Sequence, residues 1–483
     1  AAFMPVTALA ALGVFGTGHD PYKGRLRREA DSGPYVPKGI IIEEVPWTAP
    51  KPGLPPEQAA IYEAHVKGLT KHPTSSSLKS LLSETPGFEN ARDVPAELRG
   101  TYAGAAYLAP YLKALGITAI ELLPVHQTNA SESGWDSTSN WWGYQTLAYF
   151  APNRDYAYDR SPGGPTREFA AMVQQFHDAG LEVYLDVVYN HSAEGGNWGG
   201  QVDTTGFVSM GGFATPAYYA LSDQLTLVDG ATGCSNQLNF SSDVTQRLVL
   251  DSLAYWCDVM GVDGYRFDLA PVLGRTPMAY DREDVEKQRR FSSSHPLLGA
   301  IRDLAADRRI EVIAEAWDLW GYEVGNFPSG WGEWNGRYRD TMRSFCKGDA
   351  NTQAFIDQLN GDYAHFSDQG GPQHSVDLVT AHDGFTLADL VSYNAKINDQ
   401  PYPFGPSDGG SDNNQSWDSG GNQAFRRQRI RNFITLLFLS RGVPMIVSGD
   451  EYGRTQNGNN NPWCLDTIGI WNNWAAVGTN APQ

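Results

Sequence analysis

The segment VDGYRFDLA (262–270) places an arginine and a carboxylate two residues apart in an otherwise apolar and aromatic run. Residues i and i+2 of a β-strand point to the same face, so we expect Arg266 and Asp268 to face one direction. Taken alone, such a pair is more often a structural ion pair inside a barrel than part of an active site. The other polar residues of the chain decide between these interpretations.

Further polar side chains end other apolar, β-rich runs. They are Asp186, Asn190 and His191 in 181–191, Glu315 in 310–318, and His382 and Asp383 in 376–384. If the strands are parallel, their carboxyl ends meet at one edge of the sheet. Several buried carboxylates at one edge are electrostatically costly unless they serve a function, which favours an active site.

The chemistry that such a cluster permits is glycoside hydrolysis. A retaining glycosidase needs two carboxyl groups about 5–5.5 Å apart on either side of the scissile bond. One stays ionised and attacks the anomeric carbon, and the other keeps its proton and gives it to the leaving oxygen. An arginine two residues from the nucleophile would keep that carboxylate ionised and oriented.

The elements that position these residues alternate between strands and helices from residue 61 onward. Strands are predicted in 61–68, 117–125, 181–191, 262–270, 310–318, 376–384 and 443–451, with an eighth in 331–340. Helical periodicity fits 166–180, 242–261 and 422–441. This alternation predicts parallel strands with right-handed crossovers. It favours an α/β (β/α)8 barrel, and the lack of GxGxxG after the first strand disfavours a dinucleotide fold.

The expected organisation is an irregular lead-in at 1–60, a catalytic barrel at 61–470 and a C-terminal remnant at 471–483. Two polar connections, 192–240 and 271–298, are long for a compact domain. In a barrel they would rise over the carboxyl-terminal face, where active sites lie.

The charge composition limits the classes of partner that the chain could bind. Lys and Arg number 36 against 55 Asp and Glu, and the net charge of −19 argues against nucleic acid and anionic membranes. The first twenty residues are too short and too interrupted by Pro and Gly to span a bilayer, and without a basic start they are not an intact signal peptide. The four cysteines form no CxxC zinc motif, which leaves two disulfides in one of three pairings, or free thiols.

Four motifs match a known pattern. DVVYNH (186–191), GYRFDLA (264–270), AEAW (314–317) and AHDG (381–384) resemble, in order, the four signature regions of the α-amylase superfamily. The resemblance runs from about residue 32 to about residue 470. Finer features resemble bacterial isoamylases and glycogen-debranching enzymes: DSGPYVPKG (31–39), WWGYQTLAYFAPNRDYAY (141–158), YNHSAEGG (189–196), YPFGPSDGG (402–410) and GDEYGRTQNGNNNPW (449–463).

The resemblance implies a role for each candidate residue. Asp268 would be the nucleophile, Glu315 the general acid/base, and Asp383 the third carboxylate, which grips hydroxyls of the reacting sugar. Five further residues would bind substrate or support the site. Arg266 would orient Asp268, and Asp186 would support the site. His191 and His382 would hydrogen-bond the sugar, and Tyr144 would stack on it.

The reaction that the resemblance implies is hydrolysis of α-1,6 branch linkages in glycogen or amylopectin, with a branched α-glucan as the partner and the oligomeric state left open. Two alternatives stay open: an α-1,4-glucan hydrolase or glucanotransferase of the same superfamily, and a non-catalytic glucan-binding protein. The resemblance favours a secreted or periplasmic location, with the cytoplasm as the alternative.

Two features differ from the family pattern. Isoamylase-like enzymes carry β-sandwich domains before and after the barrel, and here these are expected to be absent or truncated. Some relatives bind a structural calcium after the second strand, but in PVHQTNASES (124–133) Gln127 and Ala130 stand where carboxylate ligands would be expected. No cofactor and no metal ligand are therefore predicted, and a structural calcium is left open as the alternative.

Overall fold

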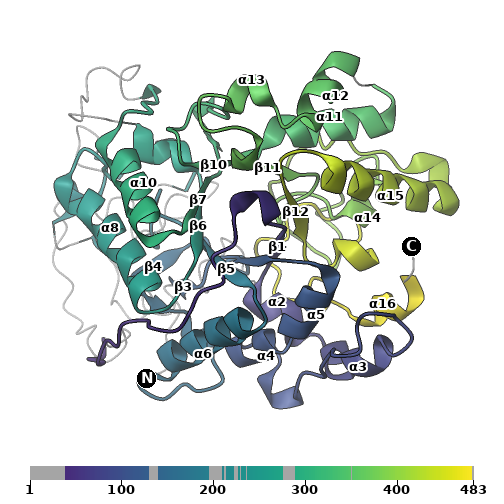
Figure 1. Ribbon diagram of the computed structural model, residues 1–483, viewed down its shortest axis with the longest axis horizontal. Helices are drawn as coiled ribbons and strands as arrows, with labels where there is room; N and C mark the ends of the chain where they lie inside the picture. Colours follow the sequence, from purple (N-terminus) through teal and green to yellow (C-terminus); the bar gives the residue numbers. More distant parts are fainter. Residues whose placement is uncertain are drawn as a thin grey trace.

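The apolar runs form a closed barrel of parallel strands (Figure 1). The computed structural model describes residues 39–129, 140–194, 209–211, 214–221, 227–228, 230–234, 236–275, 289–349 and 351–480. The barrel strands are β1 (Ile61–Ala64), β2 (Ala119–Leu122), β5 (Glu182–Val187), β6 (Gly264–Phe267), β7 (Glu311–Ala314), β10 (Gly332–Asn335), β11 (Ser375–Leu378) and β12 (Val443–Val447). Each pairs in parallel with the next, and β12 pairs with β1. The predicted (β/α)8 fold is confirmed, and the eighth strand is β10.

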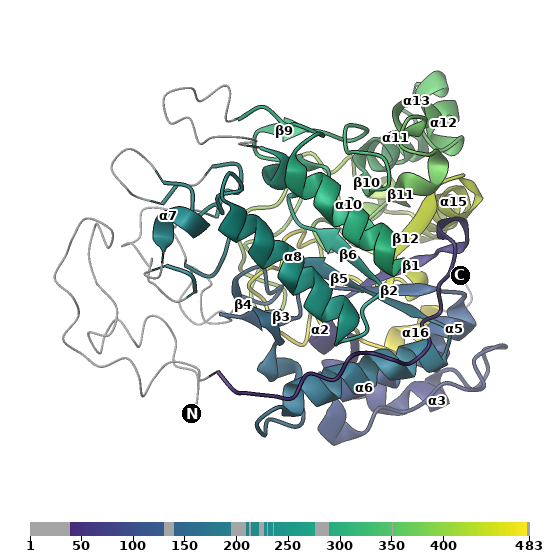
Figure 2. The same ribbon diagram turned by 60° about the vertical axis from the view of Figure 1, so that its left-hand side comes forward.

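Helices cover the outside of the barrel and connect its strands (Figure 1). In the described part of the chain they are α2 (Val66–Lys71), α3 (Leu78–Leu81), α4 (Tyr102–Ala106), α5 (Ala109–Leu115), α6 (Gly164–Asp178), α7 (Thr215–Tyr218), α8 (Asp243–Asp258), α10 (Pro296–Arg308), α11 (Gly336–Lys347), α12 (Thr352–Leu359), α13 (Tyr363–Phe366), α14 (Leu387–Leu390), α15 (Gln423–Leu439) and α16 (Ala475–Asn480). Helices α6, α8 and α15 match the three helices expected from sequence periodicity. In Figure 2, α8 and α10 lie side by side across the outer surface of the barrel.

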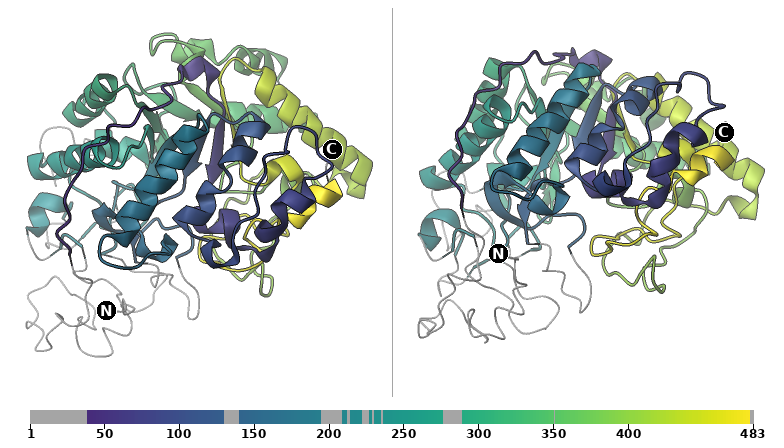
Figure 3. Two further views of the ribbon diagram at one scale, coloured as in Figure 1. Left: turned by 60° about the horizontal axis from the view of Figure 1, so that its bottom comes forward. Right: turned by 90° about the horizontal axis from the view of Figure 1, so that it is seen from below.

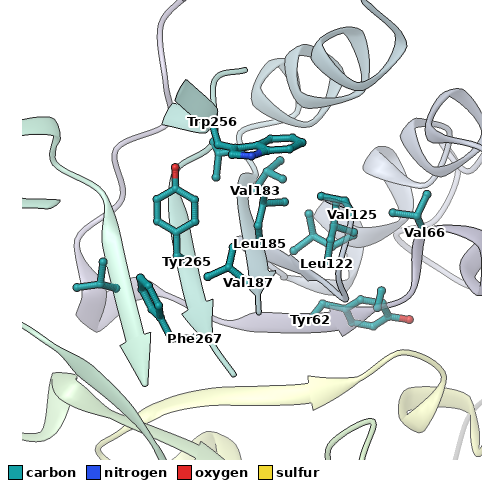
Figure 4. Packing of buried hydrophobic residues seen from close by; sticks show 14 of the residues in the cluster. Tyr62, Val66, Leu122, Val125, Val183, Leu185, Val187, Trp256, Tyr265 and Phe267 are labelled. Carbon is teal, nitrogen blue, oxygen red and sulfur yellow. The ribbon is translucent and has the colours of Figure 1, made fainter. Parts of the chain in front are cut away.

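Alternation along each strand separates two apolar layers. Val183, Leu185 and Val187 of β5 point outward and pack in the same cluster as Trp256 of α8 (Figure 4). Tyr184 belongs to a second cluster, made by residues that point into the barrel. Both faces of β5 are therefore buried, as expected for a strand that is covered by helices on one side and by the barrel interior on the other.

Residues 39–60, which belong to the expected lead-in, run along the helical shell towards β1 (Figure 3). Within them the structure has one turn of 3-10 helix, Pro56–Gln58. The Trp47 amide donates to the Asp258 carbonyl at 2.6 Å, and the Leu54 amide donates to Glu182 at 2.8 Å. Residues 1–38, which hold most of the DSGPYVPKG motif, and parts of the predicted long loops, 195–208 and 276–288 among them, lie outside the described residues.

Two short antiparallel ribbons extend the strand ends. One, β3 (His126–Thr128) with β4 (Thr146–Pro152), follows β2, and the other, β8 (Trp317–Asp318) with β9 (Gly321–Tyr322), follows β7. The sequence analysis did not predict either ribbon. They matter because one carries the chain past Tyr144 and the other begins two residues after Glu315.

The structure also narrows the cysteine pairings. Cys257 and Cys346 are free thiols, so the expected alternative of two disulfides is wrong. Among the described residues, none of the helices combines the length and the hydrophobicity that crossing a bilayer requires.

The two valines on α8 provide a matched test of this packing. Val249 is 0 % exposed and Val244 is 48 % exposed. We expect Val249→Ala to lower the free energy of unfolding by about 2 kcal/mol, because it removes buried methyl groups and leaves a cavity. Val244→Ala should change it by less than about 0.5 kcal/mol. Urea denaturation of both variants measures this difference, and equal losses would contradict the burial of this helix face.

Candidate active site

The eight side chains singled out from the sequence lie at the carboxyl-terminal edge of the barrel strands or in the segments beyond it. Asp186 lies in β5 and Arg266 in β6, Asp268 and Glu315 directly follow β6 and β7, His191 follows β5, His382 and Asp383 follow β11, and Tyr144 precedes β4. In (β/α)8 barrels this edge is where active sites are built.

Arg266 holds three of the carboxylates together. Its Nη1 lies 2.9 and 2.8 Å from the two oxygens of Asp186 and 3.2 Å from Oδ1 of Asp268. Its Nη2 lies 3.0 Å from Oε2 of Glu315. The ring of Trp334 packs against the guanidinium, with 4.1 Å between Cζ and the ring centroid. Asp268 and Glu315, 47 residues apart in the sequence, therefore meet at one planar cation.

Asp268 is fixed from both sides and stays partly open. Asn190 donates from Nδ2 to Asp268 Oδ2 at 2.7 Å and to the Asp268 carbonyl at 3.0 Å. The next residue, Leu269, has a left-handed backbone conformation with φ of 43°, so the chain turns sharply after the carboxylate. The side chain of Asp268 is 15 % exposed, against 1 % for Arg266. Asp268 is thus held by hydrogen bonds and remains partly accessible to solvent.

Glu315 is in an environment that favours its neutral form. Burial raises the pKa of its carboxyl to about 8, an effect that Arg266 opposes and that the charges of Asp268 and Asp383 reinforce. Its Oε2 already forms an ion pair with Nη2 of Arg266 at 3.0 Å and accepts from the Leu269 amide at 2.7 Å. The proton therefore belongs on Oε1. At neutral pH the site holds one carboxylic acid beside Asp268.

Tyr144 and His382 form one wall of the site. Their rings stack with centroids 5.2 Å apart and an angle of 20° between the planes. The Tyr144 hydroxyl donates to Asp186 Oδ2, and it lies 3.0 Å from His382 Nε2. Burial raises the pKa of Asp186 to about 6, although Arg266 opposes this shift, so the carboxyl is ionised at neutral pH. Tyr144 is thereby tied to the same carboxylate as Arg266.

His191 and Asp383 occupy different positions around this wall. His191 Nε2 lies 2.9 Å from the Tyr144 carbonyl, and its Nδ1 lies 2.6 Å from Asn190 Oδ1. It therefore contacts the backbone of the wall. Asp383 is exposed, and its charge affects both Glu315 and His382. The geometry thus brings seven of the eight residues into a network of contacts and places Asp383 at its open side.

The sequence analysis did not name several residues of this site. Glu63 of β1 binds His382, and Trp334 of β10 covers Arg266. Trp142 meets the His382 ring edge to face at 4.8 Å. Asn190, which the sequence analysis named without assigning it a role, binds Asp268. Glu63 had a weak signal, a single acid inside the apolar run IYEA.

The β8–β9 ribbon adds aromatic surface beside the acid. Trp317, two residues after Glu315, stacks on Tyr322 with a centroid distance of 5.9 Å and an angle of 6°. A buried ion pair holds the ribbon in place, because Asp318 accepts from Arg275 Nε at 2.5 Å and from Nη2 at 2.7 Å. Flat aromatic faces of this kind suit the CH faces of sugars.

A metal is not indicated by the described residues, which contain no group of three or more His, Cys, Asp and Glu that could hold an ion. In the segment expected to correspond to a calcium loop, Gln127 Oε1 accepts from the Arg154 amide at 3.1 Å. Residues 130–133 of that segment, Ala130 included, lie outside the described residues.

The sequence is similar to those of known proteins over most of its length. Residues 76–209 match the family model described as alpha amylase, catalytic domain. An isoamylase of Flavobacterium sp is 44% identical over 473 residues, which cover 94% of this chain and 58% of that protein. A glycogen debranching enzyme of Yersinia pestis is 40% identical over 92% of this chain and 64% of its own length. The chain therefore spans about three fifths of these relatives.

Solved structures show the same fold. Pullulanase type I from Bacillus subtilis, complexed with maltose, superimposes with a TM-score of 0.64 at 24% identity, over 92% of this chain and 57% of that one. Pullulanase from Bacillus acidopullulyticus gives a TM-score of 0.61 at 22% identity, over 90% and 48%. Because the sequence relatives align over most of the chain, it belongs to the isoamylase and glycogen-debranching branch of the α-amylase superfamily.

Proposed function

We propose that the chain is the catalytic barrel of a retaining glycoside hydrolase that cleaves α-1,6 branch linkages of glycogen and amylopectin. The observation that carries the proposal is the contact of Asp268 and Glu315 with one guanidinium, that of Arg266. A carboxylate and a carboxylic acid at one pocket are the pair that a retaining mechanism needs.

In the first step Asp268 acts as the nucleophile. Its carboxylate attacks the anomeric carbon while Glu315 gives its proton to the leaving glycosidic oxygen, and a covalent glycosyl-enzyme forms. Arg266 keeps the Asp268 carboxylate oriented at 3.2 Å. The neutral state of Glu315, which results mainly from burial, supplies the acid at neutral pH.

In the second step Glu315 acts as a base. Once ionised, its carboxylate takes a proton from a water molecule, and the oxygen of that water displaces Asp268 from the anomeric carbon. Two displacements at the same carbon give overall retention of configuration. In this proposal Asp383, which is exposed, binds hydroxyls of the sugar, and the stacked rings of Tyr144 and His382 bound the site.

The choice of the α-1,6 linkage rests on the relatives, which are named isoamylase and glycogen debranching enzyme. The aromatic pair Trp317 and Tyr322 adds a stacking surface next to the acid, where a chain on the leaving-group side would lie. The −19 net charge is compatible with a neutral polysaccharide.

Incubation with glycogen, pullulan and amylose tests the linkage. We expect loss of branches from glycogen and release of linear chains, with no shortening of amylose, because debranching leaves α-1,4 bonds intact. Chain-length profiles before and after incubation measure this. Amylose shortening or disproportionation would instead identify an α-1,4 hydrolase or glucanotransferase, and glycogen binding without reducing-end release would identify a non-catalytic binding protein.

Asp268→Asn tests the nucleophile. The variant should lose about 10⁴-fold or more in kcat, because an amide cannot form the glycosyl-enzyme, while the dissociation constant for glycogen stays within a few-fold. Reducing-end release and affinity electrophoresis measure the two effects. Asp303→Asn on α10, where the side chain is 67 % exposed, is the matched control and should leave both unchanged. Residual activity well above this level in Asp268→Asn would refute the assignment.

The role of Glu315 predicts a pH dependence. The acid form is complete below its raised pKa and is lost as the pH rises through about 8, so glucan hydrolysis should decline there. Glu315→Gln should lower glucan hydrolysis by about 10²–10⁴-fold and remove this dependence. With an α-glucosyl or α-maltosyl fluoride, whose leaving group needs no proton, the variant should still release a burst of one equivalent of fluoride.

Glu84→Gln is the control for this experiment, since Glu84 is exposed. It should behave as the wild type with both substrates. A Glu315→Gln variant that hydrolyses glucan at the wild-type rate, or that gives no fluoride burst while folded, would contradict the assignment of Glu315 as the acid.

A further inference from the structure

Glu63 of β1 directs its whole carboxylate at one residue of the active site. Its Oε1 lies 2.6 Å from Nδ1 of His382, and its Oε2 accepts from the His382 backbone amide at 2.7 Å. The Glu63 side chain is 1 % exposed and that of His382 is 10 % exposed. A carboxylate accepts hydrogen bonds only, so Nδ1 of His382 must carry a proton.

The second ring nitrogen of His382, Nε2, faces the Tyr144 hydroxyl, whose proton is already donated to another acceptor. His382 Nε2 lies 3.0 Å from the Tyr144 hydroxyl, which gives its single proton to Asp186 Oδ2. Because the two oxygens of Asp186 also accept from Arg266, this carboxyl is the acceptor of the Tyr144 proton. The Tyr144 oxygen therefore offers a lone pair to His382, and Nε2 must carry a proton as well.

The charges around His382 come from several elements. Glu63 faces it from β1, Asp186 from β5 through Tyr144, Arg266 from β6, and Asp383 from the next position in the chain. Burial lowers the pKa of His382, but the charge and hydrogen bond of Glu63 outweigh it, and the net shift is upward. Arg266 opposes this increase and Asp383 adds to it.

We propose that Glu63 is a positioning residue that holds His382 as a doubly protonated imidazolium, with Nε2–H directed at Tyr144 on the wall of the sugar pocket. The cation in turn favours the ionised form of Asp186, the shared acceptor of Tyr144 and Arg266. The importance of Glu63 for turnover rests on the proposed function, whereas the protonation state of His382 does not depend on it.

Histidine NMR of the complete chain tests the protonation state without substrate. In protein labelled with ¹³C and ¹⁵N at histidine, the His382 resonances are identified by their loss in His382→Gln. In the wild type we expect both ring nitrogens to be protonated at pH 7. A neutral His382 ring at pH 7 would overturn the proposal, whatever the enzyme does to glucans.

Glu63→Gln then tests the cause. Removing the negative charge should lower the pH at which His382 loses its proton by about one to two units. The matched control is Glu121→Gln, because Glu121 is the Cα partner of Glu63 in the neighbouring strand β2. Glu121 is 1 % exposed, and burial raises its pKa well above the usual range, so an amide there replaces a neutral carboxyl. Glu121→Gln should not change the pH at which His382 loses its proton.

Activity gives a readout that a merely structural role would not move. In Glu63→Gln the alkaline limb of kcat against pH should shift to lower pH, whereas Glu121→Gln should keep the wild-type profile. An unshifted His382 titration in folded Glu63→Gln, or equal shifts in both variants, would overturn the proposal. A chain that cleaves no glucan but shows the expected titrations would refute the proposed function and leave the role of Glu63 intact.

Discussion

The active site depends on one buried guanidinium. Arg266 is 1 % exposed, and an isolated charge at such a position would be very costly. Three carboxyl groups contact its two Nη atoms and the ring of Trp334 covers its face, whereas its buried Nε has no hydrogen-bond partner among the described residues. A lysine could supply the charge but could not engage several separate carboxyl groups with fixed geometry. The planar fork therefore sets where Asp268 and Glu315 lie relative to each other.

Strand register brings that fork to its partners. Asp186 and Arg266 are Cα partners in the pairing of β5 with β6, and Phe267 pairs with Ala314 of β7. Asp268 and Glu315 each lie one residue beyond these last pairs, where the ladder ends and the backbone turns. The regular barrel strands thus fix the base of the site. The irregular backbone that follows them, such as the left-handed conformation of Leu269, sets the directions of the side chains.

Much of this arrangement could be predicted from the sequence, because it depends on patterns among residues that are close together in the chain. Apolar runs indicated seven of the eight strands, whereas β10 lies in the more polar segment 331–340, and the spacing of Arg266 and Asp268 indicated a common direction. The ribbons β3–β4 and β8–β9 left no comparable signal, since their strands of two to seven residues carry little periodicity. Glu63 could not be assigned a role, because its partner His382 is 319 residues away and the contact exists only in three dimensions.

That distant contact links the site to closure of the barrel. Strand β1 pairs with β2 on one side and with β12 on the other, so Glu63 reaches its final position only when the first and last strands meet. His382 follows β11, the neighbour of β12. Unlike the Asp186–Arg266 pair, which adjacent strands form in register, the Glu63–His382 pair requires the complete ring of strands. An open sheet of the same strands could hold the nucleophile beside Arg266, but its His382 would lack the carboxylate that keeps the ring charged.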